Sequence, residues 1–125
     1  MSSKLKISEE ASEQLSLLSK RLDLRRNIVC RLAIGRSLAE TASVNSIRPK
    51  DSAGYEFNRY TLTGEYDDLF KALVRQHEGK KMDDREYFST FLRNHLERGI
   101  QILYKEYQRI NSPIDFFADL FKSNN

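Results

Sequence analysis

The fold is decided by one stretch near the N-terminus, residues 4–38, which reads KLKISEEASEQLSLLSKRLDLRRNIVCRLAIGRSL. Its opening residues alternate polar and apolar side chains, and this alternation predicts a short strand. Leu5 and Ile7 would lie on the buried face of the strand. Lys4 and Lys6 would lie on the opposite face and point outward.

Two helices are predicted after this strand. The first spans about residues 9–22, because Ser8 is a good N-cap and an apolar stripe follows at spacings of four, three and four. Residues 23–25 interrupt the pattern, and the second helix spans about residues 26–40. Apolar side chains surround most of its circumference, so this helix must be buried on several sides.

Short strand, helix, tight turn and helix is the order of a ribbon-helix-helix unit, a DNA-binding fold that pairs its strands between two subunits. A lone short strand is not stable by itself. We therefore expect a mainly α, ribbon-helix-helix-like helical domain with one or two short strands, assembled as an oligomer. The alternative interpretation of residues 4–7 is an N-terminal arm with solvated lysines.

The second half of the chain repeats this order in a degenerate form. Residues 60–63 alternate again, and Thr63 can cap a helix. The apolar stripe of that helix would consist of Tyr66, Phe70, Leu73 and His77. A longer helix capped by Asp83 or Asp84 follows, and residues 41–54 before this half are expected to form a connecting loop.

A chain of 125 residues fits one compact domain, residues 1–125. Within it we predict pseudo-repeat units at 3–40 and 57–107 and a C-terminal helix at 113–122. Chance alignment of two amphipathic units is the alternative explanation of the repeat. The phenylalanines of the terminal helix should pack against the core or a neighbouring subunit: Phe116, Phe117 and Phe121.

Positive charge is concentrated in the first third of the chain. The net charge is +3, from 21 Lys and Arg against 18 Asp and Glu. Between residues 20 and 36, six cationic side chains accompany one acid, Asp23. Such a patch favours a polyanionic partner. We predict that DNA is contacted by Lys4, Lys6, Lys20, Arg21, Arg25, Arg26 and Asn27.

The beginning of the second helix is a candidate phosphate site, since free N–H groups and the helix dipole attract anions there. Two adjacent arginines, Arg25 and Arg26, suggest a negative partner, although a salt bridge to Asp23 or to another subunit is the alternative. Arg31 and Arg36 either pair with acids across an interface or reach a phosphate. Gly35 suggests a close helix–helix approach, preferably in an oligomer.

The sequence offers little for catalysis. His77 and His95 are far apart, and no Gly-rich phosphate loop or metal-ligand cluster is apparent. The acid pairs at 67–68 and 83–84 fall near helix starts, where capping explains them. Cys30 is interpreted as a small buried hydrophobe, with a sulfur-transfer role left open. We expect that the protein is not an enzyme and that it has no catalytic residue, no cofactor and no metal site.

The chain carries one cysteine, no apolar segment of signal-peptide type near the N-terminus and no run of about 18 apolar residues that could span a bilayer. We expect a cytoplasmic protein that is not associated with a membrane.

Residues 24–38, LRRNIVCRLAIGRSL, resemble the signature of the DndE family of bacterial DNA sulfur-modification (phosphorothioation) systems. Residues 92–99, LRNHLERG, are similar to the C-terminal part of that family. The resemblance implies a protein encoded with the DndC and DndD components, which replace a non-bridging phosphate oxygen by sulfur taken from a cysteine desulfurase. It also implies a homotetramer that binds nicked duplex DNA, and it supplies no catalytic residue.

Three functions remain open. The first is a DNA-binding accessory subunit of a phosphorothioation system, which binds duplex DNA, nicked in preference, through the basic patch. The second is a ribbon-helix-helix transcriptional repressor that reads base edges. The third is a scaffold of the modification complex whose basic face meets an acidic subunit and never contacts DNA.

Overall fold

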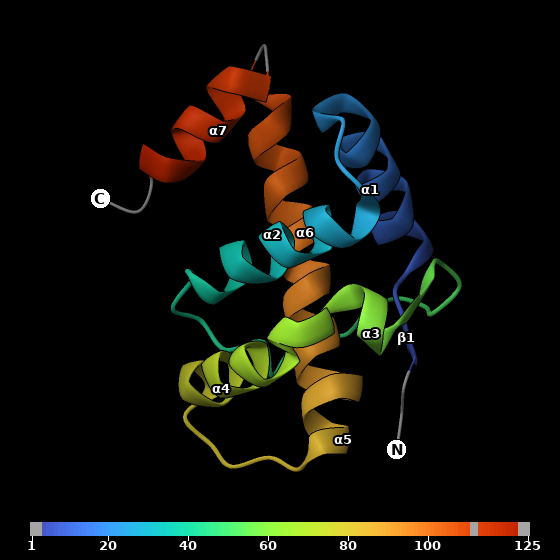
Figure 1. The fold of residues 1–125 in the computed structure, drawn as a ribbon, viewed down its shortest axis with the longest axis vertical. Helices are drawn as coiled ribbons and strands as arrows, with labels where there is room; N and C mark the ends of the chain where they lie inside the picture. Colours follow the sequence, from blue (N-terminus) through green and yellow to red (C-terminus); the bar gives the residue numbers. More distant parts are fainter. Residues whose placement is uncertain (1–3, 111–112, 123–125) are drawn as a thin grey trace.

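The computed structural model describes residues 4–110 and 113–122, and it is mainly helical (Figure 1). The elements in chain order are β1 (Lys4–Lys6), α1 (Glu9–Leu22), α2 (Arg26–Leu38), β2 (Glu56–Asn58), α3 (Arg59–Leu62), the 3-10 helix η1 (Gly64–Tyr66), α4 (Asp67–Glu78), α5 (Asp84–Glu86), the π-helix η2 (Tyr87–Leu92), α6 (Arg93–Gln108) and α7 (Pro113–Lys122).

The first strand pairs within the chain. β1 lies antiparallel to β2, with Leu5 opposite Phe57, and both of these side chains are buried. Ile7 extends the pairing, because its N–H donates to the Tyr55 carbonyl at 3.0 Å. The pairing partner of a ribbon-helix-helix strand would come from a second subunit, whereas here the same chain supplies it. The predicted faces of β1 are confirmed, since Leu5 is buried and both of its lysines are exposed.

α1 has the predicted bounds. The Ser8 hydroxyl accepts from the Ala11 N–H at 3.1 Å and so caps the helix, as expected. The Ser8 N–H and hydroxyl donate to the two carboxylate oxygens of Glu97, at 2.7 and 2.9 Å. This pair of bonds ties the junction of β1 and α1 to α6, far along the chain.

α2 is buried on several sides, as its composition predicts, and it ends at Leu38 rather than at about residue 40. Its most extensive contact is with α6. A Cβ atom on Gly99 of α6 would lie 1.8 Å from the Ala33 carbonyl oxygen, so the two backbones touch there. Gly35 has nothing within 4 Å of such a Cβ, and the close approach expected at Gly35 lies at Gly99 within this chain.

The second half differs from the prediction in the positions of its first elements. The strand is Glu56–Asn58, and residues 59–62 form the short helix α3, capped by the Asn58 side chain that accepts from the Tyr60 N–H. Pairing with β1 selects the strand residues, because Phe57 is the side chain that covers Leu5. The predicted stripe of α4 is only partly correct. Val74 is its buried residue, whereas the large exposed apolar side chains of this region include Tyr66, Leu69 and Leu73.

A long helical rod runs from α5 through η2 to α6 and passes behind α2 and α4 in Figure 1. It begins at Asp83, whose side chain accepts from the Glu86 N–H at 2.8 Å, as one of the two predicted caps. The segment η2, which lies between α5 and α6, is a π-helix, a type of helix that is uncommon in proteins. Its buried residues are Tyr87, Phe88, Phe91 and Leu92.

The loop at 41–54 contains no helix or strand, as predicted, and it is fastened to the core. Val44 is fully buried, and its carbonyl accepts from the Asn94 amide at 3.1 Å. At the other end of the chain, α7 forms the predicted terminal helix. Phe117 is partly buried against the core, Phe121 is exposed, and the Phe116 side chain lies outside the described residues.

Among the described residues, no helix has the length and apolarity needed to cross a membrane.

Candidate functional site

The turn between α1 and α2 is short and well fixed. Asp23 adopts the left-handed conformation, with φ 55° and ψ 47°, and its N–H donates to the Ser19 carbonyl. The Leu24 N–H donates to the same carbonyl at 3.1 Å, and the Ser19 hydroxyl donates to the Leu24 carbonyl. Aspartate tolerates this conformation because its short polar side chain can bond locally. The turn therefore holds the residues before and after it at fixed positions.

Four cationic side chains surround this turn, and all four are exposed: Lys20, Arg21, Arg25 and Arg26. Within residues 4–110 and 113–122, none of them forms an ion pair with a carboxylate, and the alternative bridge to Asp23 is therefore not formed. The Arg26 guanidinium lies over the Tyr55 ring, 4.1 Å from its centroid. This stacking orients one cation and leaves its charge available.

α2 begins inside this group of cations. Arg25 is its N-cap, with an extended backbone and no side-chain hydrogen bond to the free N–H groups. The first turn of α2 contains no acidic residue, and Asn27 is half-buried there. Unsatisfied N–H groups and the positive end of the helix dipole favour an anion at such a terminus. We call Lys20, Arg21, Arg25, Arg26 and Asn27 the turn group.

The two remaining residues predicted to contact DNA, Lys4 and Lys6, lie on the exposed face of β1, and we call them the strand group. β1 precedes α1, whereas the turn group follows it. The structure therefore does not bring the predicted residues into one cluster. It places them in two cationic groups at opposite ends of α1 (Figure 1).

Arg31 and Arg36 are engaged within the chain. Arg36 forms an ion pair with Glu106 at 2.8 Å and a second with Glu40 at 3.2 Å. The Arg31 Nε donates to the Leu62 carbonyl at 2.9 Å. The expectation that these arginines pair across an interface or reach a phosphate is therefore corrected, since their own chain supplies the partners.

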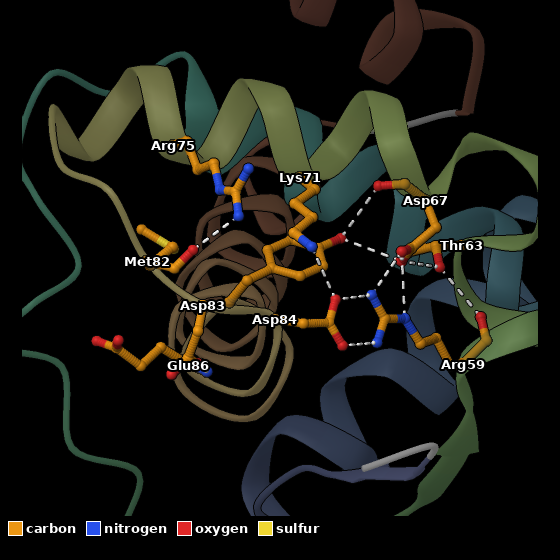
Figure 2. A network of polar contacts seen from close by, with 10 residues as sticks. Arg59, Thr63, Asp67, Lys71, Arg75, Met82, Asp83, Asp84 and Glu86 are labelled. Carbon is orange, nitrogen blue, oxygen red and sulfur yellow. Dashed lines mark hydrogen bonds and ion pairs between the residues drawn. The ribbon is translucent and has the colours of Figure 1, made fainter. Parts of the chain in front are cut away.

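A polar network that sequence reasoning missed joins α3, α4 and α5 (Figure 2). Arg59 donates to both oxygens of Asp84 at 2.7 Å and to Asp67 at 2.6 Å. Lys71 also donates to Asp84, at 3.0 Å, and Thr63 donates to Asp67 at 2.7 Å. The positions of the acid pairs near helix starts predict capping, and nothing in their spacing indicates that Asp67 and Asp84 meet on one guanidinium.

Electrostatics agrees with this geometry. Hydrogen bonds from Arg59 and Lys71 hold the pKa of Asp84 well below its usual range. Burial raises the pKa of Asp67, but the hydrogen bonds from Arg59 and Thr63 outweigh it, and the pKa is lowered. The Asp67 and Asp84 carboxylates are therefore ionised at neutral pH. The network has a structural role, since it fixes the start of the helical rod against α4.

A second buried cluster lies where α2, α4 and α6 meet. The Glu78 Oε2 atom is 2.6 Å from His77 Nδ1 and 3.2 Å from His95 Nε2. The two imidazole rings meet edge to face, with centroids 4.8 Å apart. His95 is fully buried, and the side chains of His77 and Glu78 are 10% and 1% exposed. The two histidines are far apart in the sequence, and packing brings them together.

Burial lowers the pKa of His95 to about 4, with the neighbouring His77 acting in the same direction, so this ring is neutral at pH 7. Burial raises the pKa of Glu78, but hydrogen bonds from Ser43 and His77 outweigh it and leave the pKa lowered. The Ser37 hydroxyl lies 2.8 Å from His95 Nδ1 and accepts from Arg98 Nε at 2.8 Å.

The contacts of Ser37, His95 and Glu78 follow the order of a hydrolase triad, yet they do not form an active site. Ser37 and His95 are both 0% exposed, so no substrate can reach the hydroxyl. A triad serine needs an open approach and an oxyanion site beside it.

Cys30 is fully buried in α2, and burial raises its pKa to about 12. A thiol is a weak nucleophile compared with a thiolate, so this side chain behaves as the small hydrophobe that the sequence predicts.

These features define a class of protein: a small, mainly helical protein with a two-stranded sheet formed within the chain and two exposed cationic groups. The family of DNA sulphur modification protein DndE matches residues 4–111, and the chain belongs to this family. The early resemblance is therefore confirmed.

Solved structures support the same fold. The crystal structure of DndE from Escherichia coli B7A, described as involved in DNA phosphorothioation modification, is 20% identical and has a TM-score of 0.66. The match covers 80% of this chain and 96% of that one. A crystal structure of a DndE mutant is 21% identical, with a TM-score of 0.63 and coverage of 82% and 97%. The comparison with curated proteins found no match.

Proposed function

We propose that this chain is a DNA-binding accessory subunit of a bacterial DNA phosphorothioation system, acting in the cytoplasm beside the DndC and DndD components on duplex DNA, nicked in preference. The observation that carries the proposal is the turn group. Its four cations are exposed and form no ion pair with a described carboxylate, and they surround a helix N-terminus that has no side-chain cap. Phosphate oxygens fit both features.

The arrangement suits contacts to the DNA backbone rather than to base edges. The 14 residues of α1 make a helix about 21 Å long, which corresponds to about six base pairs of duplex. The strand group and the turn group would therefore contact phosphates that are well separated along the DNA. Phosphate contacts position a protein without reading sequence. A repressor is less well supported, because β1 pairs with β2 and not with a second subunit.

An accessory role without catalysis is part of the proposal. Two observations support it: the side chains of Ser37, His95 and Glu78, which lie in triad order, are at most 1% exposed, and the single cysteine is a buried thiol. Positioning and binding are what the exposed surface offers.

Removing three of the four charges of the turn group is expected to weaken binding to a nicked duplex on the order of 100-fold at low salt. The variant Lys20→Gln, Arg21→Gln, Arg25→Gln replaces three cations by shorter, neutral, polar side chains and leaves the Arg26–Tyr55 contact in place. Each lost phosphate contact should also lower the slope of log K against log salt by about 0.9. Fluorescence anisotropy over a salt series measures both quantities.

A charge-matched control removes three cations near α5: Lys80→Gln, Lys81→Gln, Arg85→Gln. These residues are exposed, and α5 lies at the bottom of Figure 1, whereas the turn group lies in its upper part. The control should retain its affinity within a few-fold. If both triple variants lost the same affinity for DNA, net charge alone would explain the effect, and the localised site would be refuted. No binding of nicked or intact duplex by the unaltered protein would favour the scaffold function.

Assembly as a homo-oligomer, a tetramer by family resemblance, is the second part of the proposal. Exposed apolar side chains on η1 and α4 support it, since Tyr66, Leu69 and Leu73 are 47%, 56% and 38% exposed. Leu73 also lines a groove with Gly35, where the glycine leaves open space. Large exposed apolar patches commonly mark interfaces.

The variant Leu69→Ser, Leu73→Ser should reduce the particle to a single chain while retaining its helical content. Light scattering with and without nicked DNA measures the mass, and Ala72→Ser, an exposed change on the same helix, should leave it unaltered. If the particle mass of the double variant were unaltered, the interface between subunits would not lie on α4.

A further inference from the structure

We propose that His77, Glu78 and His95 bind a transition-metal ion of the Zn²⁺ type between α4 and α6. The ligand atoms would be His77 Nδ1, Glu78 Oε2 and His95 Nε2. These three residues form a group whose ligand atoms all lie within 4.8 Å of one another. The proposal is independent of DNA binding, because the site is separate from the turn group and the strand group.

The separations of the ligand atoms suit a single small ion. Zn²⁺ holds imidazole nitrogen and carboxylate oxygen at about 2.0–2.2 Å in tetrahedral geometry, which places neighbouring ligand atoms roughly 3.3 Å apart. Here the carboxylate oxygen is 2.6 Å from one ring nitrogen and 3.2 Å from the other. The ligand atoms of the whole group lie within 4.8 Å of one another. The carboxylate oxygen would therefore move away from His77 Nδ1, and the ring nitrogens would adjust around the ion.

Each ligand is held from behind by a separate partner. His77 Nε2 is hydrogen-bonded to the Glu40 carbonyl at 2.5 Å, and His95 Nδ1 is hydrogen-bonded to the Ser37 hydroxyl at 2.8 Å. The second carboxylate oxygen of Glu78 accepts from the Ser43 hydroxyl. Metal-binding histidines almost always use their outer nitrogen in this way, which fixes the tautomer and directs the inner nitrogen at the ion.

The chemistry of the set selects the metal class. Two imidazoles and one carboxylate match the ligands that Zn²⁺ uses in sites with three protein ligands and one open position. Mg²⁺ and Ca²⁺ prefer oxygen ligands and should bind poorly. Access exists on one side, because His77 is partly exposed and lines the shallow groove with Gly35 and Leu38.

The test uses the full, untagged chain, stripped with a chelator and then titrated with Co²⁺ and Zn²⁺. We expect one Co²⁺ per chain with visible d–d absorption of tetrahedral type, displacement by Zn²⁺, and no response to Mg²⁺. A rise in the unfolding temperature with Zn²⁺ concentration should accompany binding.

Three variants decide whether the assigned residues hold the ion. Because His95 is fully buried and its replacement can unfold the chain, His77→Gln is the decisive change, and it should lower affinity at least 100-fold with unaltered circular dichroism. Ser43→Ala, behind the carboxylate, should lower affinity about 10-fold to 100-fold. Glu86→Gln, an exposed carboxylate change, should leave affinity unaltered. Absence of Co²⁺ and Zn²⁺ binding by the unaltered protein, or equal affinity of the folded His77→Gln variant, would overturn the proposal.

Discussion

Replacing Gly99 with alanine is expected to lower the free energy of unfolding by about 3 kcal/mol, at the upper end of the range for overpacking a core. The new Cβ atom would lie 1.8 Å from the Ala33 carbonyl oxygen and 2.4 Å from its carbon. Both are backbone atoms of α2, so no rotamer change can relieve the clash. The two helices would have to separate along the most extensive contact in the protein.

Gly35→Ala is the matched control, because it makes the same chemical change in the other helix of this pair. Its Cβ meets nothing within 4 Å, and alanine favours a helix interior over glycine by about 1 kcal/mol. We expect an unaltered or slightly raised free energy of unfolding. Urea unfolding followed by circular dichroism gives both values. Equal stability of the two variants would contradict the close packing of α2 on α6.

The second large effect is expected for Arg59→Ala, with a loss of about 3 kcal/mol at neutral pH. Removing one partner of a largely buried ion pair leaves the other charge uncompensated. The Arg59 side chain is 18% exposed, and those of Asp67 and Asp84 are 19% and 27% exposed, so solvent screens the loss only in part. The guanidinium also lies 4.7 Å from the Phe88 ring centroid, and that contact is lost as well.

The pH dependence of this loss provides an internal check. The pKa values of Asp67 and Asp84 are lowered in the folded protein, so their stabilising contribution is complete above the ordinary carboxyl pKa and declines as the pH falls below it. The difference between the parent and Arg59→Ala should therefore narrow below about pH 3.9. Arg85→Ala, an exposed change on α5, should cost less than about 0.5 kcal/mol at every pH. If Arg59→Ala lowered the free energy of unfolding by no more than Arg85→Ala, the network would not stabilise the fold.

Several elements could be predicted from the sequence because their causes are local. α1 follows from the Ser8 cap and one apolar stripe, and the outward lysines of β1 follow from alternation over three residues. The turn group was predicted for the same reason, since neighbours in sequence at a helix junction remain neighbours in space. Family membership likewise follows from contiguous residues, and the match over 4–111 confirms it.

Contacts between distant residues could not be predicted in this way. Alternation predicts the strand of the second half at 60–63, whereas pairing of Phe57 with Leu5 selects 56–58. Arg59 meets Asp67 and Asp84 only because α4 packs beside the start of the rod.

The sequence alone determined the helical class, the ends of the first helix, the location of positive charge and the family, because capping, periodicity and local composition act over a few residues. Only the tertiary structure decided which strand pairs with β1, which glycine lets two helices touch, and that His77, Glu78 and His95 share one buried space. Burial and approach depend on the packing of whole elements, and the spacing of residues along the chain does not contain that information.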